Sequence, residues 1–390
     1  MKIAVAKERR AHEHRVAAST DTVKKLVALG AQVVVEEGAG RGASILDADF
    51  EAAGAGLAPD YAAAVGDADI VLKVRRPLSG GNGAVDELAP LAAGTVLLCL
   101  MAPHIDPEEL ETYARQGVLA FAMEYMPRIT RAQTMDVLSS QSNLAGYKAV
   151  IEAAHHYNRA FPMMMTAAGT IPPARLVVLG AGVAGLQAIA TARRMGAIVS
   201  AFDVRAAAKE QVESLGASFV EVEGIEDAET AAGYAREVSE DDKRRQAEAL
   251  HAHLKKQDIA ISTALIPGRP APVLITEQMV KDMKPGSVIV DLAVEAGGNC
   301  ALSEPGEVVE REGVTIVGHA NMASRVAADA SKLYARNLLN FLTPLIDSET
   351  GELSIDWEDE IVTGTLLTRD GAIVHPSLAP PPPAAVAGDE

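Results

Sequence analysis

Short apolar runs alternate with stretches of helical periodicity along the first 140 residues of the chain. The apolar runs predict buried strands at residues 2–6, 32–36, 70–74, 95–99 and 118–122. A helix is predicted at residues 20–29, because Ser19 can cap its start and Gly30 follows its end, and another at 107–116. Strands that alternate with helices are typical of a parallel sheet covered on both faces.

A second series of such elements follows. A long amphipathic helix is expected at residues 138–157, and a further helix at 323–342 would return the chain to the first domain. Strands are expected at 175–179, 198–202, 219–222, 259–263, 287–292 and 315–317. The pattern predicts an α/β protein with two Rossmann-like, doubly wound parallel-sheet domains joined by long helices, with a cleft between them. The expected domains are 1–138 plus 327–378, and 139–326.

One glycine-rich turn in the second domain points to a dinucleotide. Gly180, Gly182 and Gly185 form G-x-G-x-x-G between an apolar strand and an apolar-periodic helix. The first glycine permits a tight turn, the second lets the backbone approach a pyrophosphate, and the third lets helix and strand pack closely. Asp203 ends the next predicted strand, at about the 20-residue spacing expected of an acid that binds the ribose.

Asp203 also bears on the choice between NAD(H) and NADP(H). A carboxylate there accepts hydrogen bonds from ribose hydroxyls and repels a 2′-phosphate, so it favours NAD(H). Arg205 is a counter-signal, because it could hold a 2′-phosphate; it could equally be a surface charge or stack on adenine. The glycine-rich stretch 38–43 lacks a following strand that ends in an acid and is interpreted as a loop, which leaves one convincing dinucleotide site.

Residues 128–143 are dense in hydrogen-bonding side chains. A nicotinamide carboxamide needs both a donor and an acceptor, and this segment supplies both. Spacing leaves two interpretations open: contact with the nicotinamide, or simple N-capping of the long helix by Asp136 or Ser139. The segment 264–268 follows a predicted strand end, where a backbone contact with the nicotinamide is also expected.

Two segments have compositions that are not typical of a packed core. Residues 224–256 are charged and rich in small residues, which predicts a lid or protruding loop; a plain solvated helix is the alternative for 239–256. The proline-rich residues 379–390 predict a disordered tail.

Composition excludes several classes of function. The net charge of −18 argues against a nucleic-acid partner. Cys99 and Cys300 are the two cysteines and lie far apart, which indicates a reducing compartment; no secretory signal is expected. The longest uncharged run, 88–103, is too short to span a bilayer, so no direct membrane insertion is expected. The histidine pairs have no metal-like spacing, and no metal site is predicted.

Several segments together resemble the NAD(H)-binding subunits of proton-translocating nicotinamide nucleotide transhydrogenases, in the alanine dehydrogenase/transhydrogenase family. They are residues 7–17, 126–147, 161–170, 180–187 and 291–299. The resemblance implies that Arg128, Gln133, Asp136 and Ser139 orient the nicotinamide, and that Tyr234 lies on a mobile loop, 224–240, that closes over it. It implies further contacts from Ile129, Thr130, Val183, Asp203, Val204, Arg205, Gly233, Gln246 and Leu265.

The resemblance also implies an activity and partners. The activity is Si-specific, proton-translocating NAD(P)⁺ transhydrogenation, in which NADH on this chain gives hydride to NADP⁺ on a partner subunit. The implied assembly contains a homodimer of this chain, an NADP(H)-binding subunit and an integral membrane subunit that conducts protons. The chain would then be cytoplasmic and peripheral on the inner face of the plasma membrane. Hydride transfer between two nicotinamides requires oriented rings and no general acid or base, which fits a chain with one dinucleotide site.

Two alternatives remain. An alanine dehydrogenase would resemble this chain at Arg15 and Lys73, which would hold pyruvate. It also needs an acid/base histidine where this chain has Leu100, and His104 lies beyond a proline. We therefore expect structural roles for Arg15 and Lys73. The other alternative is an NAD-binding sensor module, which would bind without turnover.

Overall fold

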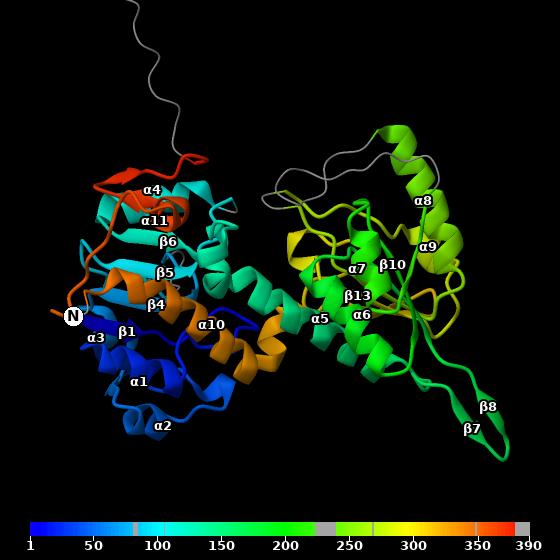
Figure 1. The fold of residues 1–390 in the computed structure, drawn as a ribbon, viewed down its shortest axis with the longest axis horizontal. Coiled ribbons are helices and arrows are strands. Elements are labelled where there is room, and N and C mark those ends of the chain that lie inside the picture. The colour runs from blue at the N-terminus through cyan, green and yellow to red at the C-terminus, as the bar shows by residue number, and fades with distance from the viewer. Residues whose placement is uncertain (81–84, 105, 223–238, 267–268, 348, 379–390) are drawn as a thin grey trace, which may run out of the picture. The chain divides into compact units, whose positions relative to one another are not determined.

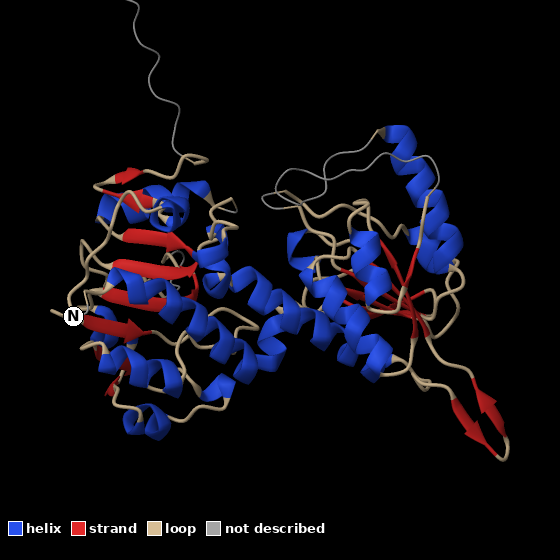
Figure 2. Ribbon diagram, in the orientation of Figure 1, coloured by secondary structure: helices blue, strands red, loops and turns tan. Residues whose placement is uncertain are grey.

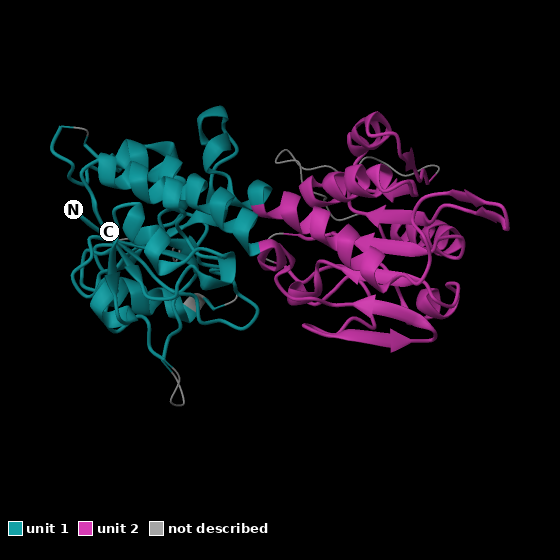
Figure 3. Ribbon diagram, turned by 90° about the horizontal axis from the view of Figure 1, so that it is seen from below, with its two compact units in different colours: residues 1–140, 327–390 teal, residues 141–326 magenta. Residues whose placement is uncertain are grey.

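The computed structural model describes residues 1–80, 85–104, 106–222, 239–266, 269–347 and 349–378 (Figure 1). The chain divides into two compact units, shown in Figure 3. Unit 1 contains residues 1–140 and 327–390, and unit 2 contains residues 141–326. The chain enters unit 2 within helix α5 (Val137–His156) and returns to unit 1 at the start of α10 (Ala327–Leu342).

Unit 1 is built on a six-stranded sheet whose strand pairs are all parallel (Figure 2). Its strands, in spatial order, are β3 (Gly56–Ala58), β2 (Gln32–Glu36), β1 (Lys2–Val5), β4 (Ile70–Arg75), β5 (Val96–Leu100) and β6 (Leu119–Ala122). This order is that of a doubly wound fold, and the strand order reverses between β1 and β4. The carboxyl ends of those two strands are where a fold of this kind usually binds its ligand.

Helices bury both faces of this sheet. Ile3 and Val5 of β1 face a core that includes Phe50 of α2 and Tyr334 of α10, whereas Ala4 faces the opposite core. This alternation follows from the two-residue period of a strand. The helices of the unit are α1 (Thr20–Ala28), α2 (Asp47–Ala52), α3 (Tyr61–Val65), α4 (Pro107–Gln116), α10 and α11 (Glu360–Thr365). The strands β16 (Thr368–Arg369) and β17 (Ala372–Ile373) form a small antiparallel hairpin.

Unit 2 repeats the doubly wound order in a seven-stranded sheet. Its strands, in spatial order, are β11 (Ser218–Phe219), β10 (Ile198–Phe202), β9 (Arg175–Leu179), β12 (Ile259–Ser262), β13 (Val288–Asp291), β15 (Val314–Val317) and β14 (Val308–Arg311). The edge strand β14 is antiparallel and the remaining pairs are parallel. The reversal lies between β9 and β12. The predicted α/β class with two Rossmann-like, parallel-sheet units is confirmed.

The helices of unit 2 also cover both sheet faces. One core contains apolar residues of α5, α6 (Val183–Arg194) and α7 (Ala208–Ser214), and the other contains those of α8 (Glu240–Leu254) and α9 (Glu277–Lys281). The helix α8 occupies most of the stretch 239–256, as the plain-helix alternative expected, so a protruding loop is wrong for this stretch. The rest of the predicted lid, including Gly233 and Tyr234, lies outside the described residues, as does the predicted tail 379–390.

A hairpin that the sequence did not predict extends from unit 2 (Figures 1 and 2). It pairs β7 (Met164–Thr166) with β8 (Gly169–Ile171), and both strands are exposed along their whole length. Met165 has 78% of its surface exposed. Across the described parts of the chain, no helix has the length and apolar character that crossing a membrane requires.

Candidate functional site

The glycine-rich turn joins β9 to α6 in the geometry that its spacing predicts. Gly180 has φ +95°, a left-handed conformation that favours glycine. A Cβ added to Gly185 would collide with the carbonyl oxygen of Gly180, so the turn and the helix approach too closely for any side chain. These two glycines therefore have structural reasons for their identity.

Gly182 differs, because a Cβ added there would meet no atom within 4 Å. Gly182 is the N-cap of the 12-residue helix α6, and no side chain caps that helix end. Val183, the first residue of the helix, is partly exposed. The first N–H groups of a helix carry a positive partial charge and bind anions well. The open space, the missing cap and the helix direction fit a dinucleotide pyrophosphate.

Asp203 lies at the end of β10 beside this turn, and its carboxylate already accepts several hydrogen bonds. Its Oδ2 accepts from the backbone N–H of Ala181 at 2.7 Å and from the Arg205 guanidinium at 2.8 Å. Its Oδ1 accepts from the backbone N–H and the Nε of Arg205, both at 2.9 Å. A carboxylate has about four lone-pair sites. A ribose can therefore bind Asp203 only when the Arg205 side chain gives up its contacts.

The end of β12 lies next to the same turn. The Thr263 hydroxyl donates to the carbonyl oxygen of Gly180 at 2.8 Å, which ties the ends of β9 and β12 together at the strand reversal. Leu265, two residues further on, has half of its surface exposed. Val204 packs against the core of this side of the sheet, and Gln246 lies half-buried on α8.

The residues expected to orient a nicotinamide lie in unit 1. They are Arg128, Ile129, the 3₁₀ helix Thr130–Met135, which contains Gln133, then Asp136, which directly precedes α5, and Ser139 in the first turn of α5. Arg128, Thr130 and Gln133 are exposed, whereas Ile129 packs against the core. The Asp136 carboxylate accepts from the Ser139 N–H at 2.9 Å and from the Ser139 hydroxyl, so Asp136 does cap α5. A cap leaves oxygen lone pairs available, so the capping role of Asp136 is compatible with contact to a nicotinamide.

Supporting residues that the sequence analysis missed hold this segment in place. The side-chain amides of Asn337 and Asn340 on α10 both donate to the carbonyl oxygen of Thr134, at 2.8 and 3.0 Å. Arg131 makes two hydrogen bonds with Asp359, and this contact lowers the pKa of that carboxyl. The partners lie about 200 residues away in sequence. The spacing of the two amides on α10 could have suggested Asn337 and Asn340, but no such signal points to Asp359.

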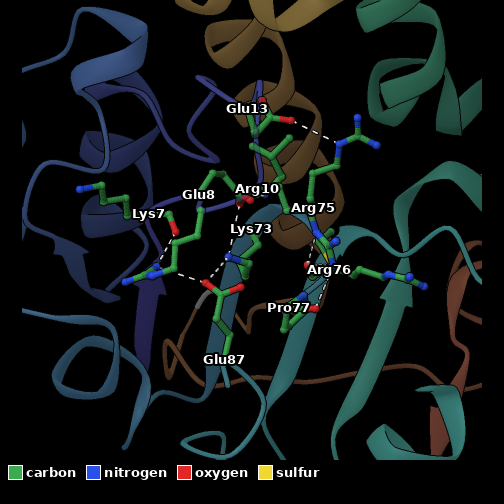
Figure 4. A network of polar contacts seen from close by, with 12 residues as sticks. Lys7, Glu8, Arg10, Glu13, Lys73, Arg75, Arg76, Pro77 and Glu87 are labelled. Carbon is green, nitrogen blue, oxygen red and sulfur yellow. Dashed lines mark hydrogen bonds and ion pairs between the residues drawn. The ribbon is translucent and has the colours of Figure 1, made fainter. Parts of the chain in front are cut away.

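A network of buried charges fills the strand reversal of unit 1 (Figure 4). The Lys73 ammonium on β4 lies 3.0 Å from the Glu87 carboxylate and 3.7 Å from that of Glu8, and Lys73 has no exposed surface. Arg15 makes two hydrogen bonds, of 2.6 and 2.7 Å, with Glu13. Each cation that an alanine dehydrogenase would use on pyruvate is therefore neutralised by a carboxylate of this chain.

The surrounding groups strengthen this network. Arg9 bridges Glu36 and Glu87, and the Tyr334 hydroxyl donates to the Lys73 carbonyl oxygen at 3.0 Å. Burial raises the pKa of Glu8, and the nearby Lys73 opposes that shift. Removing one member of such a network leaves a buried charge without its partner, which destabilises a fold strongly.

The position that would carry an acid/base histidine in an alanine dehydrogenase holds an apolar side chain. Leu100 ends β5 and packs against the unit 1 core. His104 is exposed, and its Nε2 lies 2.5 Å from the Tyr125 hydroxyl. Burial raises the pKa of Tyr125 to about 12, so the hydroxyl stays protonated near neutral pH.

One group of metal-ligand type occurs in the described residues of unit 2, where the sequence analysis expected none. Glu152, His156 and His319 bring their ligand atoms within 4.8 Å of one another. The Glu152 carboxylate also binds Lys148 and Arg325, each at 2.9 Å. Two cations on the one carboxylate repel a divalent ion, so we interpret the group as an ion-pair cluster that joins α5 to the segment before α10.

Comparisons with known proteins bear on these sites. Residues 4–145 match the family domain "Alanine dehydrogenase/PNT, N-terminal domain", and residues 149–376 match "Alanine dehydrogenase/PNT, C-terminal domain". The chain is 61% identical over 380 residues to an NAD(P) transhydrogenase alpha-subunit protein of Rhodospirillum rubrum, covering 97% of this chain and 99% of that protein. It is 33% identical over 386 residues to an alanine dehydrogenase of Halomonas elongata, covering 97% and 96%. The crystal structure of transhydrogenase from Sinorhizobium meliloti superposes with a TM-score of 0.86 at 53% identity, covering 96% of this chain and all of that one.

Proposed function

The chain belongs to the alanine dehydrogenase/PNT family, and we propose that it is the NAD(H)-binding subunit of a proton-translocating transhydrogenase. In this function NADH on the chain gives a hydride to NADP⁺ on a partner subunit, and membrane subunits couple the transfer to proton movement. The chain would then be cytoplasmic and lie on the membrane only through those partners.

A difference between the strand reversals of the two units is the main support for this proposal. Unit 2 has an open, uncapped helix end at its strand reversal, whereas unit 1 has its own ion pairs at the equivalent position. The open end supports binding of one dinucleotide by unit 2. The filled reversal of unit 1 argues against a second substrate there, so the hydride acceptor would come from another protein.

Separate groups of the chain would hold the two halves of NADH. In unit 2 the N–H groups at the start of α6 would bind the pyrophosphate, and Asp203 would accept from the ribose after Arg205 moves. In unit 1 Arg128, Gln133, Asp136 and Ser139 would fix the carboxamide. When the C4–H bond of NADH breaks, the hydride leaves with both bonding electrons and forms a C–H bond at C4 of NADP⁺. No proton is exchanged in that step, so these residues only bind and orient.

The exposed hairpin supports the homodimer within this proposal. An isolated two-stranded hairpin is marginally stable in water. Met163, Met164, Met165 and Ile171 expose apolar surface on it. A second copy of this chain would cover that surface. We propose the remaining contacts of Gly233 and Tyr234 with the cofactor only on the family resemblance, because both lie outside the described residues.

The first test compares two assays of NADH oxidation by the purified chain. One contains pyruvate and ammonium, and the other contains NADP⁺ and the NADP(H)-binding partner. We expect turnover only with the partner. Turnover with pyruvate and ammonium would overturn the proposal and point to an amino-acid dehydrogenase, whereas NADH binding without turnover in both would point to a sensor module.

Variants in unit 1 test the nicotinamide residues. Asp136→Asn keeps a residue that caps helices equally well but removes the charge. Arg128→Ala removes a guanidinium, and Arg311→Ala is its control, because Arg311 lies on the edge strand β14 of unit 2 and makes an exposed ion pair with Glu304 that contributes little to stability. We expect the first two variants to slow hydride transfer more than they weaken NADH binding. Unchanged transfer rates would remove Asp136 and Arg128 from the site.

A further inference from the structure

A buried asparagine clamps the backbone at the end of β12. The Asn299 side-chain amide donates to the carbonyl oxygens of Ala264 and Pro272, at 2.9 and 2.8 Å. Its oxygen accepts from the N–H of Ala264 at 3.0 Å. Asn299 has no exposed surface, and its side chain holds both polar groups of the Ala264 backbone. The peptide that leads into Leu265 is thereby fixed in orientation.

Asn299 is itself fixed by a second buried side chain. The Asp291 carboxylate, at the end of β13, accepts from the N–H groups of Ala293, Asn299 and Cys300, at 2.9, 2.8 and 3.0 Å. It also accepts from the hydroxyl of Ser303 at 2.7 Å. Asp291 has no exposed surface. These bonds determine the course of the loop from β13 to Asn299, because a carboxylate with several N–H donors is a strong local anchor.

The clamp is continuous with the dinucleotide turn. Thr263, adjacent to Ala264, donates to the carbonyl oxygen of Gly180, so the turn, the end of β12 and Asn299 form one connected set of hydrogen bonds. Ligands of doubly wound sheets bind at the carboxyl ends of the strands beside the reversal, and β12 is one of those strands. The Ala264–Leu265 peptide therefore lies where the half of the dinucleotide beyond the pyrophosphate would pass.

We propose that Asn299 is a positioning residue for hydride transfer: through Ala264 it fixes the backbone against which the nicotinamide half of NADH lies. The inference rests on the proposed function. It predicts that Asn299 influences the nicotinamide half of the ligand and leaves the ADP half unaffected, because the ADP half is held by the α6 end and Asp203.

The test uses Asn299→Asp in the full chain. This substitution keeps the size of the side chain and removes the two donated hydrogen bonds. We expect hydride transfer to the NADP(H)-binding partner to slow by about 10- to 100-fold at pH 8, because small displacements of reacting groups have effects of that size. Affinity for ADP-ribose should stay unchanged, whereas the affinity advantage of NADH over ADP-ribose should shrink.

Lowering the pH should restore hydride transfer in the Asn299→Asp variant. Burial and the neighbouring Asp291 carboxylate both raise the pKa of the introduced carboxyl, so it gains a proton at mildly acidic pH and can again donate to the Ala264 carbonyl. The ratio of variant to unsubstituted transfer rates should therefore rise from pH 8 to pH 6. Asn158→Asp is the matched control, since it makes the same chemical change at an exposed position just after α5, and its ratio should stay near one at both pH values. If Asn299→Asp does not fold, Asn299→Ser, which introduces no charge, should show the same separation between NADH and ADP-ribose.

Two outcomes would overturn the inference. Equal weakening of NADH and ADP-ribose, with no recovery at pH 6, would mean a general structural role. Unchanged binding and transfer would mean no role at all. If the unsubstituted chain transfers no hydride with the partner, the proposed function fails, and the ratio of NADH to ADP-ribose affinity alone decides whether Asn299 positions the nicotinamide half.

Discussion

Replacing Gly182 with alanine separates ligand binding from folding at the dinucleotide turn. Gly182 has φ −79° and ψ −167°, a conformation that alanine adopts easily, and its Cβ would contact nothing within 4 Å. We expect Gly182→Ala to keep or raise stability, by about 0.4–1 kcal/mol, because alanine restricts the unfolded chain. The added methyl group would, however, occupy the open space above the α6 N–H groups. Loss of one charge-assisted hydrogen bond costs about 1.5–3 kcal/mol, which weakens binding by about 10- to 150-fold.

Calorimetric titration with NADH and with ADP-ribose, together with urea unfolding, measures both effects. Both ligands should weaken by the same factor, because they share the pyrophosphate. Gly185→Ala provides the contrast: its Cβ would collide with the Gly180 carbonyl oxygen, so it should lower stability as well as affinity. Unchanged affinity in Gly182→Ala would refute the placement of the pyrophosphate at the start of α6.

Three further predictions concern other regions of the structure. Arg205→Ala should raise the ratio of NADH to NADPH affinity, as measured by titration. Arg205 neutralises the Asp203 carboxylate, and without Arg205 that carboxylate would repel a 2′-phosphate. A lower ratio would contradict this. Lys73→Met should cost about 3–5 kcal/mol in urea unfolding, and adding Glu87→Gln should cost less than the sum of the two single changes. Burial and nearby Arg325 lower the pKa of His319, so the unfolded chain binds more protons below about pH 6.5 and stability should fall as the pH drops from there. His319→Asn should flatten this pH dependence, and an unaltered slope in urea unfolding between pH 7.5 and 5 would contradict it.

The sequence predicted the long, strongly patterned elements best. The strand Gln32–Glu36 is found at its predicted bounds, and Ile259–Ser262 is one residue shorter than expected. The three-residue strand Gly56–Ala58 and the neighbouring short helices were missed, because alanine- and glycine-rich segments of that length show no periodicity. The hairpin that includes Met164–Thr166 was missed for another reason: neither of its faces packs on a core, so its strands lack the alternation of apolar and polar residues.

In the candidate site, too, the features that local sequence determines could be predicted and the others could not. The glycine spacing and Asp203 could be predicted because a local turn, a helix start and a strand end determine them. The contact between Asp203 and Arg205 was not predicted, although the two residues are neighbours, because side-chain direction decides it. Asn299 clamps Ala264 across 35 positions of sequence, and no single-sequence pattern reports such a pairing. Long-range hydrogen bonds from side chains to the backbone therefore require the three-dimensional structure.

The insertion of unit 2 into unit 1 imposes an order on biosynthesis. Tyr334 and Phe341 of α10 belong to the core that buries Ile3 and Val5, and the Ser331 hydroxyl accepts a hydrogen bond from the N–H of Val16. A nascent chain emerges at about 5–20 residues per second, so residues 141–326 take roughly 10–40 s to appear after residue 140. During that interval the first 140 residues lack α10, and their apolar sheet face stays open on the ribosome. Unit 2 can therefore complete its fold before unit 1, whose core closes only after α10 has been synthesised.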